Sequence, residues 1–172
     1  MPRLPQLTDD PEGLLEETQR QLGRVPNLYA ALANGPAALR GYLAMRDALT
    51  RGVLRARLRE QIALLVAQEN RCTYCVSAHT MRGTRMGLSE EELKLTRDGH
   101  DADPHADAVL QITREVVQAG GRVGDESLAR ARQAGVTDAE LAEIVAHVAL
   151  NTLSNYFNHL ARPDLDFPEV TA

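Results

Sequence analysis

The sequence predicts an all-α protein that forms one domain, and three observations support this. Apolar residues recur at spacings of three and four almost throughout the chain, whereas the alternating pattern of strands is scarce. Alanine and leucine recur throughout, tryptophan is absent and aromatic residues make up 3% of the chain. Such a composition suits helices that pack closely through small side chains rather than a β-sandwich. We therefore expect one helical domain over residues 1–172, with a short arm at 1–10 and a tail at 163–172.

The first helices are marked by capping and breaking residues. One helix is expected to begin in the segment TDDPEG, where a threonine or aspartate can cap it, and to stop at Gly23. Residues 24–35 are expected to form a loop with a short turn. Pro36 then opens a helix that runs to Gly52, since proline is favoured in the first turn.

The next two helices are expected to form a hairpin. The segment 55–70 carries apolar residues at helical spacing, and Asn70 suits its end. Its inward-facing residues are expected to be Leu58, Ile62, Leu65 and Val66. The segment that follows contains both cysteines of the chain and stops at Gly87. These two segments lie next to each other in sequence, so that they are candidates for an antiparallel pair.

Capping residues mark the remaining helices as well. Ser89 with Glu92 three positions later is the signature of a capping box. Further helices are expected at residues 103–121, 125–135 and 137–161, followed by an extended tail.

Two segments of the chain are similar to each other. QIALLVAQENRCTYC, residues 61–75, aligns without a gap with EIVAHVALNTLSNYF, residues 143–157. A duplicated helical unit whose second copy lost its cysteines would give this similarity. Two helices rich in alanine and valine would also give it by composition alone, and both explanations stay open.

Charge and hydropathy exclude several classes of partner. The formal net charge is −5 and no basic tract is present, so no nucleic-acid or membrane-surface partner is expected. No segment approaches the roughly 18 apolar residues of a membrane-spanning helix, and the first residues lack the apolar run of a secretion signal. We therefore expect a cytoplasmic protein, in which thiols are kept reduced and a cysteine pair is more often catalytic or metal-binding than structural.

Both cysteines lie in the segment CTYCVSAH, residues 72–79. If a helix begins near Cys72, Cys75 falls in its first turn, where unpaired N–H groups and the helix dipole favour a thiolate. Cys75 and His79 are four residues apart and share one helix face. A base beside a thiol at the start of a helix is an arrangement that activates a cysteine nucleophile.

Glu60 is a candidate partner for His79. It lies ten residues before Asn70, about 15 Å along one helix, and His79 lies nine residues after Asn70, about 13 Å along the next. In an antiparallel hairpin that turns near Asn70, the carboxylate comes level with the imidazole and can orient it directly or through a water. The alternative is a solvated carboxylate that pairs with Arg57 or Arg59.

These residues resemble the pattern of a known family. Glu60, eleven residues, Cys72, two residues, Cys75, three residues and His79 are similar to the motif of the alkyl hydroperoxidase D-like (AhpD-like) proteins in the carboxymuconolactone decarboxylase superfamily. The flanking segments VPNLYAALANGP, RGTRMGLSEEEL and NTLSNYFNHLARPDLDFP resemble its peroxidase-related members. The resemblance implies a helical bundle, often with an internal repeat, that assembles as a homo-trimer or as a hexamer of stacked trimers.

The resemblance also implies a function and a role for each of these residues. Cys75 would be the peroxidatic cysteine and Cys72 the resolving thiol, so that the sulfenic acid closes to a recoverable disulfide. His79 would be the base for Cys75, and Glu60 would assist through a proton relay. The implied enzyme is an alkyl hydroperoxide reductase or peroxidase that needs no cofactor. It would reduce an alkyl hydroperoxide or hydrogen peroxide with electrons from a dithiol donor such as a lipoylated protein.

The chain departs from the best-studied family pattern between its cysteines. A Ser-His pair is replaced by Thr73 and Tyr74, so that a phenol with an ordinary pKa near 10 takes the place of an imidazole. We expect either weaker peroxidase activity or a different donor. Tyr74 itself is either a wall of the substrate pocket or a packing residue.

Three other functions are compatible with the same residues. Cys72, Cys75, His79 and Glu60 could bind zinc, although a helix-borne cysteine pair holds its thiols less freely than structural zinc sites do. The thiols could form a redox sensor that oxidises once and does not turn over. The chain could also be a decarboxylase-family oligomer without peroxidase activity, although such members typically lack the cysteine pair.

Overall fold

The computed structural model describes residues 1–172, and its regular elements are all helices, which confirms the predicted all-α class. None of the helices combines the length and the hydropathy needed to cross a bilayer. In chain order they are α1 (Leu14–Leu22), α2 (Asn27–Leu32), α3 (Pro36–Leu49), α4 (Ala56–Glu69), α5 (Thr73–Arg85), α6 (Glu90–Arg97), α7 (Pro104–Ala119), α8 (Asp125–Gln133) and α9 (Asp138–Ala161).

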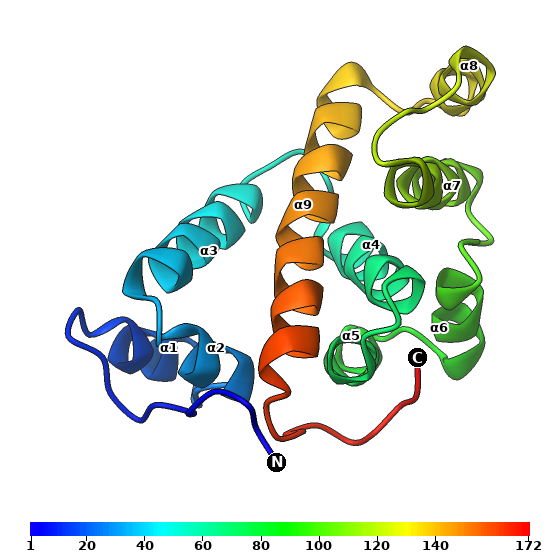
Figure 1. The fold of residues 1–172 in the computed structure, drawn as a ribbon. Coiled ribbons are helices and arrows are strands. Elements are labelled where there is room, and N and C mark those ends of the chain that lie inside the picture. The colour runs from blue at the N-terminus through cyan, green and yellow to red at the C-terminus, as the bar shows by residue number, and fades with distance from the viewer.

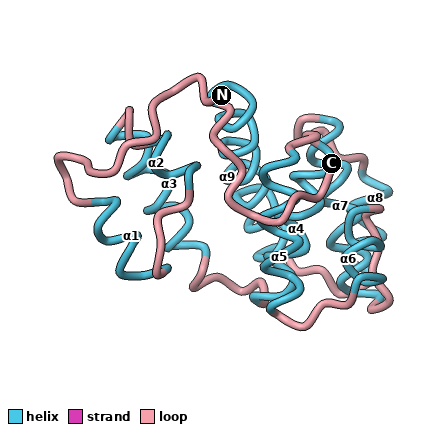
Figure 2. The backbone as a smooth tube through the Cα atoms, turned by 90° about the horizontal axis from the view of Figure 1, so that it is seen from below, coloured by secondary structure: helices cyan, strands magenta, loops and turns pink.

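Helix α9 runs through the middle of the molecule (Figure 1). The helices α1 to α3 lie on one side of it and α4 to α8 on the other, as both ribbon and tube views show (Figures 1 and 2). Helix α4 contacts α5, α6, α7 and α9. It is therefore the helix around which the larger part of the fold packs.

The buried side chains form two clusters that both include residues of α4. One cluster holds the two cysteines together with residues of α2, α3 and the C-terminal tail. The other joins α4 to α7 and α9, with Ile62 and Ile144 at 0% and 1% exposure. The inward-facing residues predicted for α4 are all buried. They are Leu58, Ile62, Leu65 and Val66.

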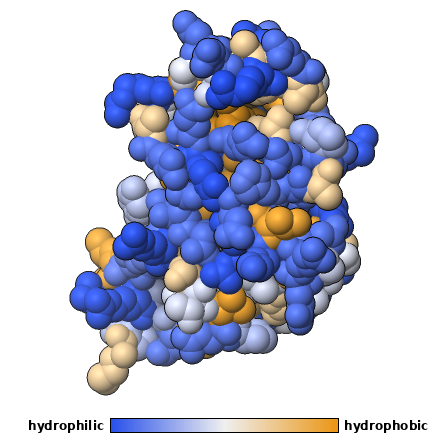
Figure 3. All heavy atoms as spheres, turned by 90° about the vertical axis from the view of Figure 1, so that its right-hand side faces the viewer, coloured by the Kyte–Doolittle hydropathy of each residue, from blue (hydrophilic) through white to orange (hydrophobic).

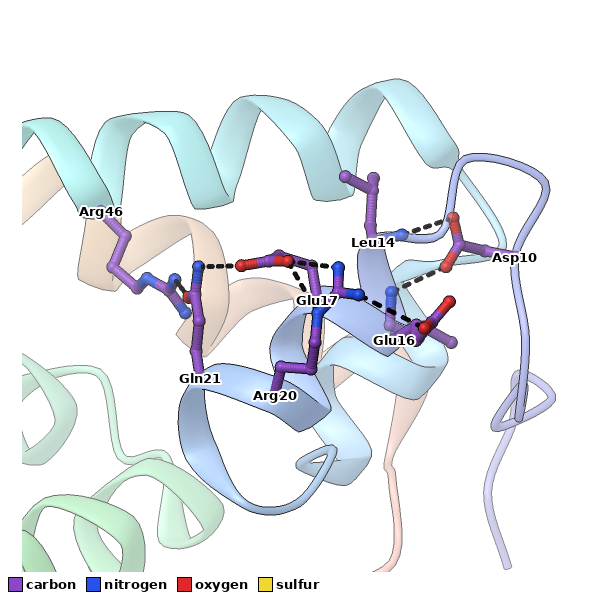
Figure 4. Close-up of polar contacts among 8 residues, drawn as sticks. Asp10, Leu14, Glu16, Glu17, Arg20, Gln21 and Arg46 are labelled. Carbon is purple, nitrogen blue, oxygen red and sulfur yellow. Dashed lines mark hydrogen bonds and ion pairs between the residues drawn. The ribbon is translucent and has the colours of Figure 1, made fainter.

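Helix α1 begins later than the sequence predicted, because the residue that caps it, Asp10, is separated from the helix by a turn. The carboxylate of Asp10 accepts hydrogen bonds from the backbone N–H groups of Leu14 and Leu15, at 3.1 Å and 2.7 Å (Figure 4). Gly13 precedes the helix with a φ of 70°, which glycine adopts without strain. Residues 8–13 therefore form a turn that delivers the Asp10 carboxylate to the free N–H groups of the helix.

The exposed side of α1 is joined to α3 by polar side chains. Arg20 contacts Glu16 and Glu17 of the preceding turn (Figure 4). Gln21 accepts a hydrogen bond from Arg46 of α3 at 3.0 Å. The two helices are thus linked at the surface as well as through the core.

The structure also corrects the segment 24–35, which was expected to be a loop with a short turn. Residues 27–32 form the helix α2, and Leu28, Tyr29 and Leu32 on it are buried in the cluster that contains the cysteines. An isolated helix of this length is not stable in water. Packing against the core therefore stabilises α2, which local sequence patterns do not reveal.

The two ends of the chain run over the helices. The C-terminal tail is extended, as predicted, and crosses from the end of α9 to α6 (Figure 1). Ser77 of α5 accepts a hydrogen bond from the backbone of Val170 at 2.9 Å, and Arg97 donates to the carbonyl of Thr171 at 2.7 Å. At the other end, the backbone N–H of Arg3 bonds to the carbonyl of Ala161.

The face that Figure 3 presents is largely hydrophilic, and apolar side chains appear on it only in small groups. This is the right-hand side of Figure 1, where α6, α7 and α8 lie. A polar groove runs between α7 and α8, and none of the predicted site residues lines it.

Candidate functional site

The α4–α5 hairpin brings the predicted site residues together. Helix α4 ends at Glu69 and α5 begins at Thr73, and Arg71 between them has a left-handed φ of 54°. The N–H of Cys72 bonds to the carbonyl of Ala67 at 2.9 Å and closes the turn. A non-glycine residue is strained in this conformation, so that the packing of the two helices must hold it. The antiparallel hairpin predicted from the sequence is present.

Glu60 and His79 are in direct contact across this hairpin. Nδ1 of His79 lies 2.6 Å from Oε1 of Glu60, and the side chains are 12% and 16% exposed. Burial by itself raises the pKa of Glu60, but His79 and the Arg82 guanidinium lower it below its usual value. The carboxylate is therefore charged at neutral pH and orients the imidazole through Nδ1. That orientation leaves Nε2 as the nitrogen that exchanges a proton.

The alternative partners of Glu60 are engaged elsewhere. Arg57 pairs with Glu92 at the start of α6. Arg59 donates to the backbone carbonyl of Leu54. Of the two arrangements that the sequence left open for Glu60, the structure has the one in which its carboxylate faces His79.

Both cysteines are free thiols, with exposures of 2% for Cys72 and 4% for Cys75. The pKa of Cys72 is lowered because the thiol of Cys75 donates a hydrogen bond to it. The N–H groups of Cys75 and Tyr74, at the start of α5, also lower the pKa of Cys72. Burial, followed by the neighbouring Cys72, raises the pKa of Cys75 well above its usual value. The first proton lost by the pair therefore leaves its charge on Cys72.

This order differs from the expectation that the helix start favours a thiolate at Cys75. Cys72 itself occupies the N-cap position of α5, where the N–H groups of Tyr74 and Cys75 lower its pKa. Cys75 lies inside the helix, and its side chain is packed in the core. Desolvation therefore outweighs the helix dipole at Cys75.

Helix α9 contributes a residue that the sequence analysis did not select. Nδ2 of Asn158 donates to the sulfur of Cys75 at 3.1 Å, and the two residues are 83 positions apart in the chain. Asn158 and Asn155 both lower the pKa of Cys75, against the larger effect of burial. The signal in the sequence is the run of polar residues at helical spacing near the end of α9, Asn151, Ser154, Asn155 and Asn158.

The two cysteines open onto different spaces. Cys75 and His79 line a small cavity of about 30 Å³, together with Arg82 and aromatic residues of α2 and α3. Cys72 lines a separate, open groove between the start of α5 and the tail. Tyr74 and Asn158 border both spaces. A ligand in the cavity therefore reaches Cys75, and a ligand in the groove approaches Cys72.

Tyr74 is held firmly in the wall between these spaces. Its hydroxyl accepts a hydrogen bond from the N–H of Leu28 at 3.1 Å, and its ring meets that of Phe167 edge to face at 5.4 Å. Burial, followed by the neighbouring Asp166, raises the pKa of Tyr74. The phenol that replaces the family's imidazole is therefore neutral at physiological pH.

The structure gives no support to the zinc alternative. No three histidine, cysteine, aspartate or glutamate side chains are arranged to hold a metal ion. Glu60 instead uses its carboxylate on His79.

The protein is an all-helical chain in which a buried cysteine pair lies beside a carboxylate–imidazole pair. Residues 36–115, which include the α4–α5 hairpin, match the model of the carboxymuconolactone decarboxylase family. This match agrees with the family resemblance of the motif, and the chain has the AhpD-like helical fold of its structural relatives.

Two solved structures share this fold over almost the whole chain. An uncharacterised peroxidase-related protein from Ralstonia eutropha JMP134, described as an alkylhydroperoxidase AhpD core, is 27% identical with a TM-score of 0.83. An uncharacterised peroxidase-related protein from Silicibacter sp. TM1040 is 21% identical with a TM-score of 0.82. Each match covers 96% of this chain and 92% of the other.

A more distant structure shares the fold alone. The debrominase Bmp8 in complex with 2,3,4-tribromopyrrole is 15% identical with a TM-score of 0.76, over 91% of this chain and 86% of that chain. No curated protein matches the chain in sequence.

Proposed function

We propose that the chain is a thiol-dependent peroxidase that reduces hydrogen peroxide or alkyl hydroperoxides through a dithiol–disulfide cycle of Cys72 and Cys75. The observation that carries this proposal is that Cys75 shares a cavity with His79, which Glu60 contacts at 2.6 Å. A thiol, a base and a group that orients the base are the parts that nucleophilic attack on a peroxide needs. The peroxidase-related names of two structural relatives support the same reading.

The first half of the cycle oxidises Cys75. His79 takes the thiol proton of Cys75 through a molecule in the cavity, because no hydrogen bond joins the two side chains directly. The sulfur attacks the hydroxyl-bearing oxygen of the hydroperoxide, the S–O bond forms, and the O–O bond breaks. The alkoxide that leaves takes the proton back from His79, so that Cys75–SH and ROOH give Cys75–SOH and ROH. Glu60 stabilises the imidazolium between these two transfers.

Burial bears directly on this first step. Because it raises the pKa of Cys75, a thiolate is not stored there at neutral pH but forms as the proton is transferred. A buried, protonated thiol is also protected from non-specific oxidants, since the thiolate is the reactive form.

The second half of the cycle regenerates the thiols of Cys72 and Cys75. Cys72 condenses with the sulfenic acid, which forms the disulfide and releases one water. A dithiol donor then approaches through the groove beside Cys72 and reduces the disulfide to two thiols, while the donor itself becomes a disulfide. On the basis of the family resemblance, we propose that the donor is a lipoylated protein. We also propose that the chain assembles as a homo-trimer or hexamer and acts in the cytoplasm.

The test is peroxide consumption by the purified protein with dihydrolipoamide as donor. The wild type is expected to cycle, Cys75→Ser to lose turnover, and Cys72→Ser to consume one equivalent of peroxide without cycling. Mass mapping of the oxidised wild type should find a Cys72–Cys75 disulfide. A wild type that is oxidised once and is not reduced by any dithiol would be a sensor. A Cys72→Ser variant that cycles normally would overturn the assigned roles.

A further inference from the structure

The inward face of α9 near the site is polar, which is unusual in a core. Asn151, Ser154, Asn155 and Asn158 are all buried, with exposures of 5% or less. Buried polar groups need hydrogen-bond partners. Asn151 and Ser154 find theirs on α9 itself, by donating to the carbonyls of His147 and Asn151 at 2.8 Å and 2.9 Å. The other two side chains point away from their own helix.

Asn155 and Asn158 each find one partner on the α4–α5 hairpin, while the buried Nδ2 of Asn155 has none. Oδ1 of Asn155 accepts from Nδ2 of Asn70 at 2.9 Å, which joins α9 to the end of α4. Nδ2 of Asn158 donates to the sulfur of Cys75 at 3.1 Å. The carboxamides of α9 are therefore part of the environment of the reactive thiol.

One atom of Asn158 has no partner. Its Oδ1 is buried and accepts no hydrogen bond, although the residue is only 5% exposed. Asn158 lines the cavity that contains Cys75 and His79. An unused acceptor in the wall of a cavity points to a ligand that brings a donor with it.

The size and chemistry of the cavity narrow the choice of that ligand. A buried water needs about 10–15 Å³, so that the 30 Å³ of the cavity holds about two water-sized groups. A hydroperoxide has two adjacent oxygens and carries an O–H donor on the oxygen that a thiolate attacks, and hydrogen peroxide carries one on each oxygen.

We propose that Asn158 binds and orients the hydroperoxide, with Nδ2 on the sulfur of Cys75 and Oδ1 accepting the hydrogen bond of the peroxide O–H. This inference rests on the proposed function. It assigns to α9 a catalytic residue outside the Glu60, Cys72, Cys75 and His79 set.

The two bonds of the carboxamide define the direction of attack. The peroxide donates its O–H to Oδ1 of Asn158, and Nδ2 of the same side chain donates to the sulfur of Cys75. The terminal oxygen of the peroxide is thereby placed against that sulfur. The S–O bond forms at this oxygen, the O–O bond breaks, and the electron pair goes to the RO oxygen, which takes its proton from His79. The product is Cys75–SOH, whose O–H still faces Oδ1 of Asn158, together with the alcohol ROH.

The test compares two reagents for the same thiol in a Cys72→Ser background, where Cys75 reacts once. Hydrogen peroxide has an O–H donor for Oδ1, whereas methyl methanethiosulfonate has none. Both react with the thiolate, so that the fraction of ionised thiol cancels in the ratio of their rate constants. Asn158→Leu should lower this ratio about tenfold, the equivalent of one hydrogen bond.

Two further variants separate orientation from packing. Asn158→Asp keeps an oxygen acceptor and adds a negative charge, so that both rates should fall together and the ratio should stay near the wild-type value. Asn151→Leu alters an equally buried asparagine of the same helix that bonds only to a carbonyl of α9, and it should leave the ratio unchanged. Asn158→Ala gives the same readout as Asn158→Leu if the larger side chain prevents folding.

The outcomes distinguish this inference from the function on which it rests. A ratio that is unchanged in both Asn158→Leu and Asn158→Ala would overturn the role of Asn158 while the peroxidase stands. A wild-type Cys75 that reacts with methyl methanethiosulfonate but not with hydrogen peroxide would overturn the proposed function itself.

Discussion

Helix α4 carries two carboxylates of equal exposure, Glu60 and Glu69, each 16% exposed. Glu60 contacts His79 on α5, whereas Glu69 pairs with Arg114 of α7 at 2.8 Å. Both form a partly buried contact with a basic side chain, but only Glu60 contacts a residue, His79, that lines the cavity of Cys75. A comparison of variants at Glu69 and Glu60 therefore distinguishes the contribution of a buried carboxylate to the fold from its contribution to the reaction.

Replacement of Glu60 by glutamine should lower kcat for peroxide about 100-fold, with little change in KM. Glutamine preserves the shape of the side chain, but it is neutral and does not stabilise the imidazolium that forms during proton transfer. Steady-state peroxide consumption with a dithiol donor measures the effect. Glu69→Gln should keep the wild-type kcat, and equal kcat values for the two variants would remove Glu60 from the mechanism.

The thiol pair shows why residue-level chemistry is only partly predictable from spacing. The four-residue step from Cys75 to His79 and the hairpin register place the base near the thiol, and both are local features of the sequence. The pKa order of the two thiols depends instead on the burial of Cys75, and the sulfur of Cys75 also accepts a hydrogen bond from Asn158, which is far away in the chain. Neither burial nor a partner 83 residues distant appears in a local pattern.

At the scale of single elements, the sequence predicts those helices whose caps and apolar faces are local. Ser89 and Glu92 form the predicted capping box of α6. The start of α1 was predicted too early, because its cap, Asp10, acts across a turn. Helix α2 was missed, because its stability comes from burial of its side chains in the core rather than from its length. Packing against the core, which local patterns do not contain, accounts for α2, whereas the start of α1 depends on the geometry of a local turn.

The cap of α1 gives a prediction for this element. Asp10→Ala should lower the free energy of unfolding by about 1 kcal/mol at neutral pH, since three N–H groups lose their acceptor. Partial burial opposes ionisation, but these backbone donors lower the pKa of Asp10 overall. A lowered pKa in the folded state means that the stabilisation is present above the ordinary carboxyl pKa of about 3.9 and is lost as the pH falls through the folded-state value.

Urea unfolding at neutral pH and near pH 3 measures this difference. The gap in stability between Asp10→Ala and the wild type should shrink at the lower pH. Asp9→Ala removes the neighbouring, exposed carboxylate, which makes no hydrogen bond, and should change stability little at either pH. A gap that is equally large at both values of pH would show that the charge of Asp10 does not act as the cap.

At the scale of the whole molecule, residues from both ends of the chain close the cavity. Phe167 of the C-terminal tail lines it and packs against Tyr74. The guanidinium of Arg24, before α2, lies 4.4 Å from the centre of the Phe167 ring and also pairs with Asp166. The cavity beside Cys75 therefore exists only when the first and last segments of the fold are both in place.

This closure predicts how the molecule selects among peroxides. Phe167→Ala should raise kcat/KM for cumene hydroperoxide relative to hydrogen peroxide, because removal of the ring widens the cavity toward the tail. It should also cost about 3 kcal/mol of stability, as other truncations of buried aromatic residues do. Both quantities can be measured on the same protein, by steady-state kinetics and by urea unfolding.

Leu165→Ala provides the matched control, because Leu165 belongs to the same tail but is 38% exposed and lies on the Cys72 side. It should change neither the stability nor the preference for hydrogen peroxide to a comparable degree. If Phe167→Ala loses stability but keeps the wild-type ratio between the two peroxides, the ring supports the fold without limiting the substrate. The size of the peroxide would then be set by α2 and α3, whose side chains form the opposite wall of the cavity.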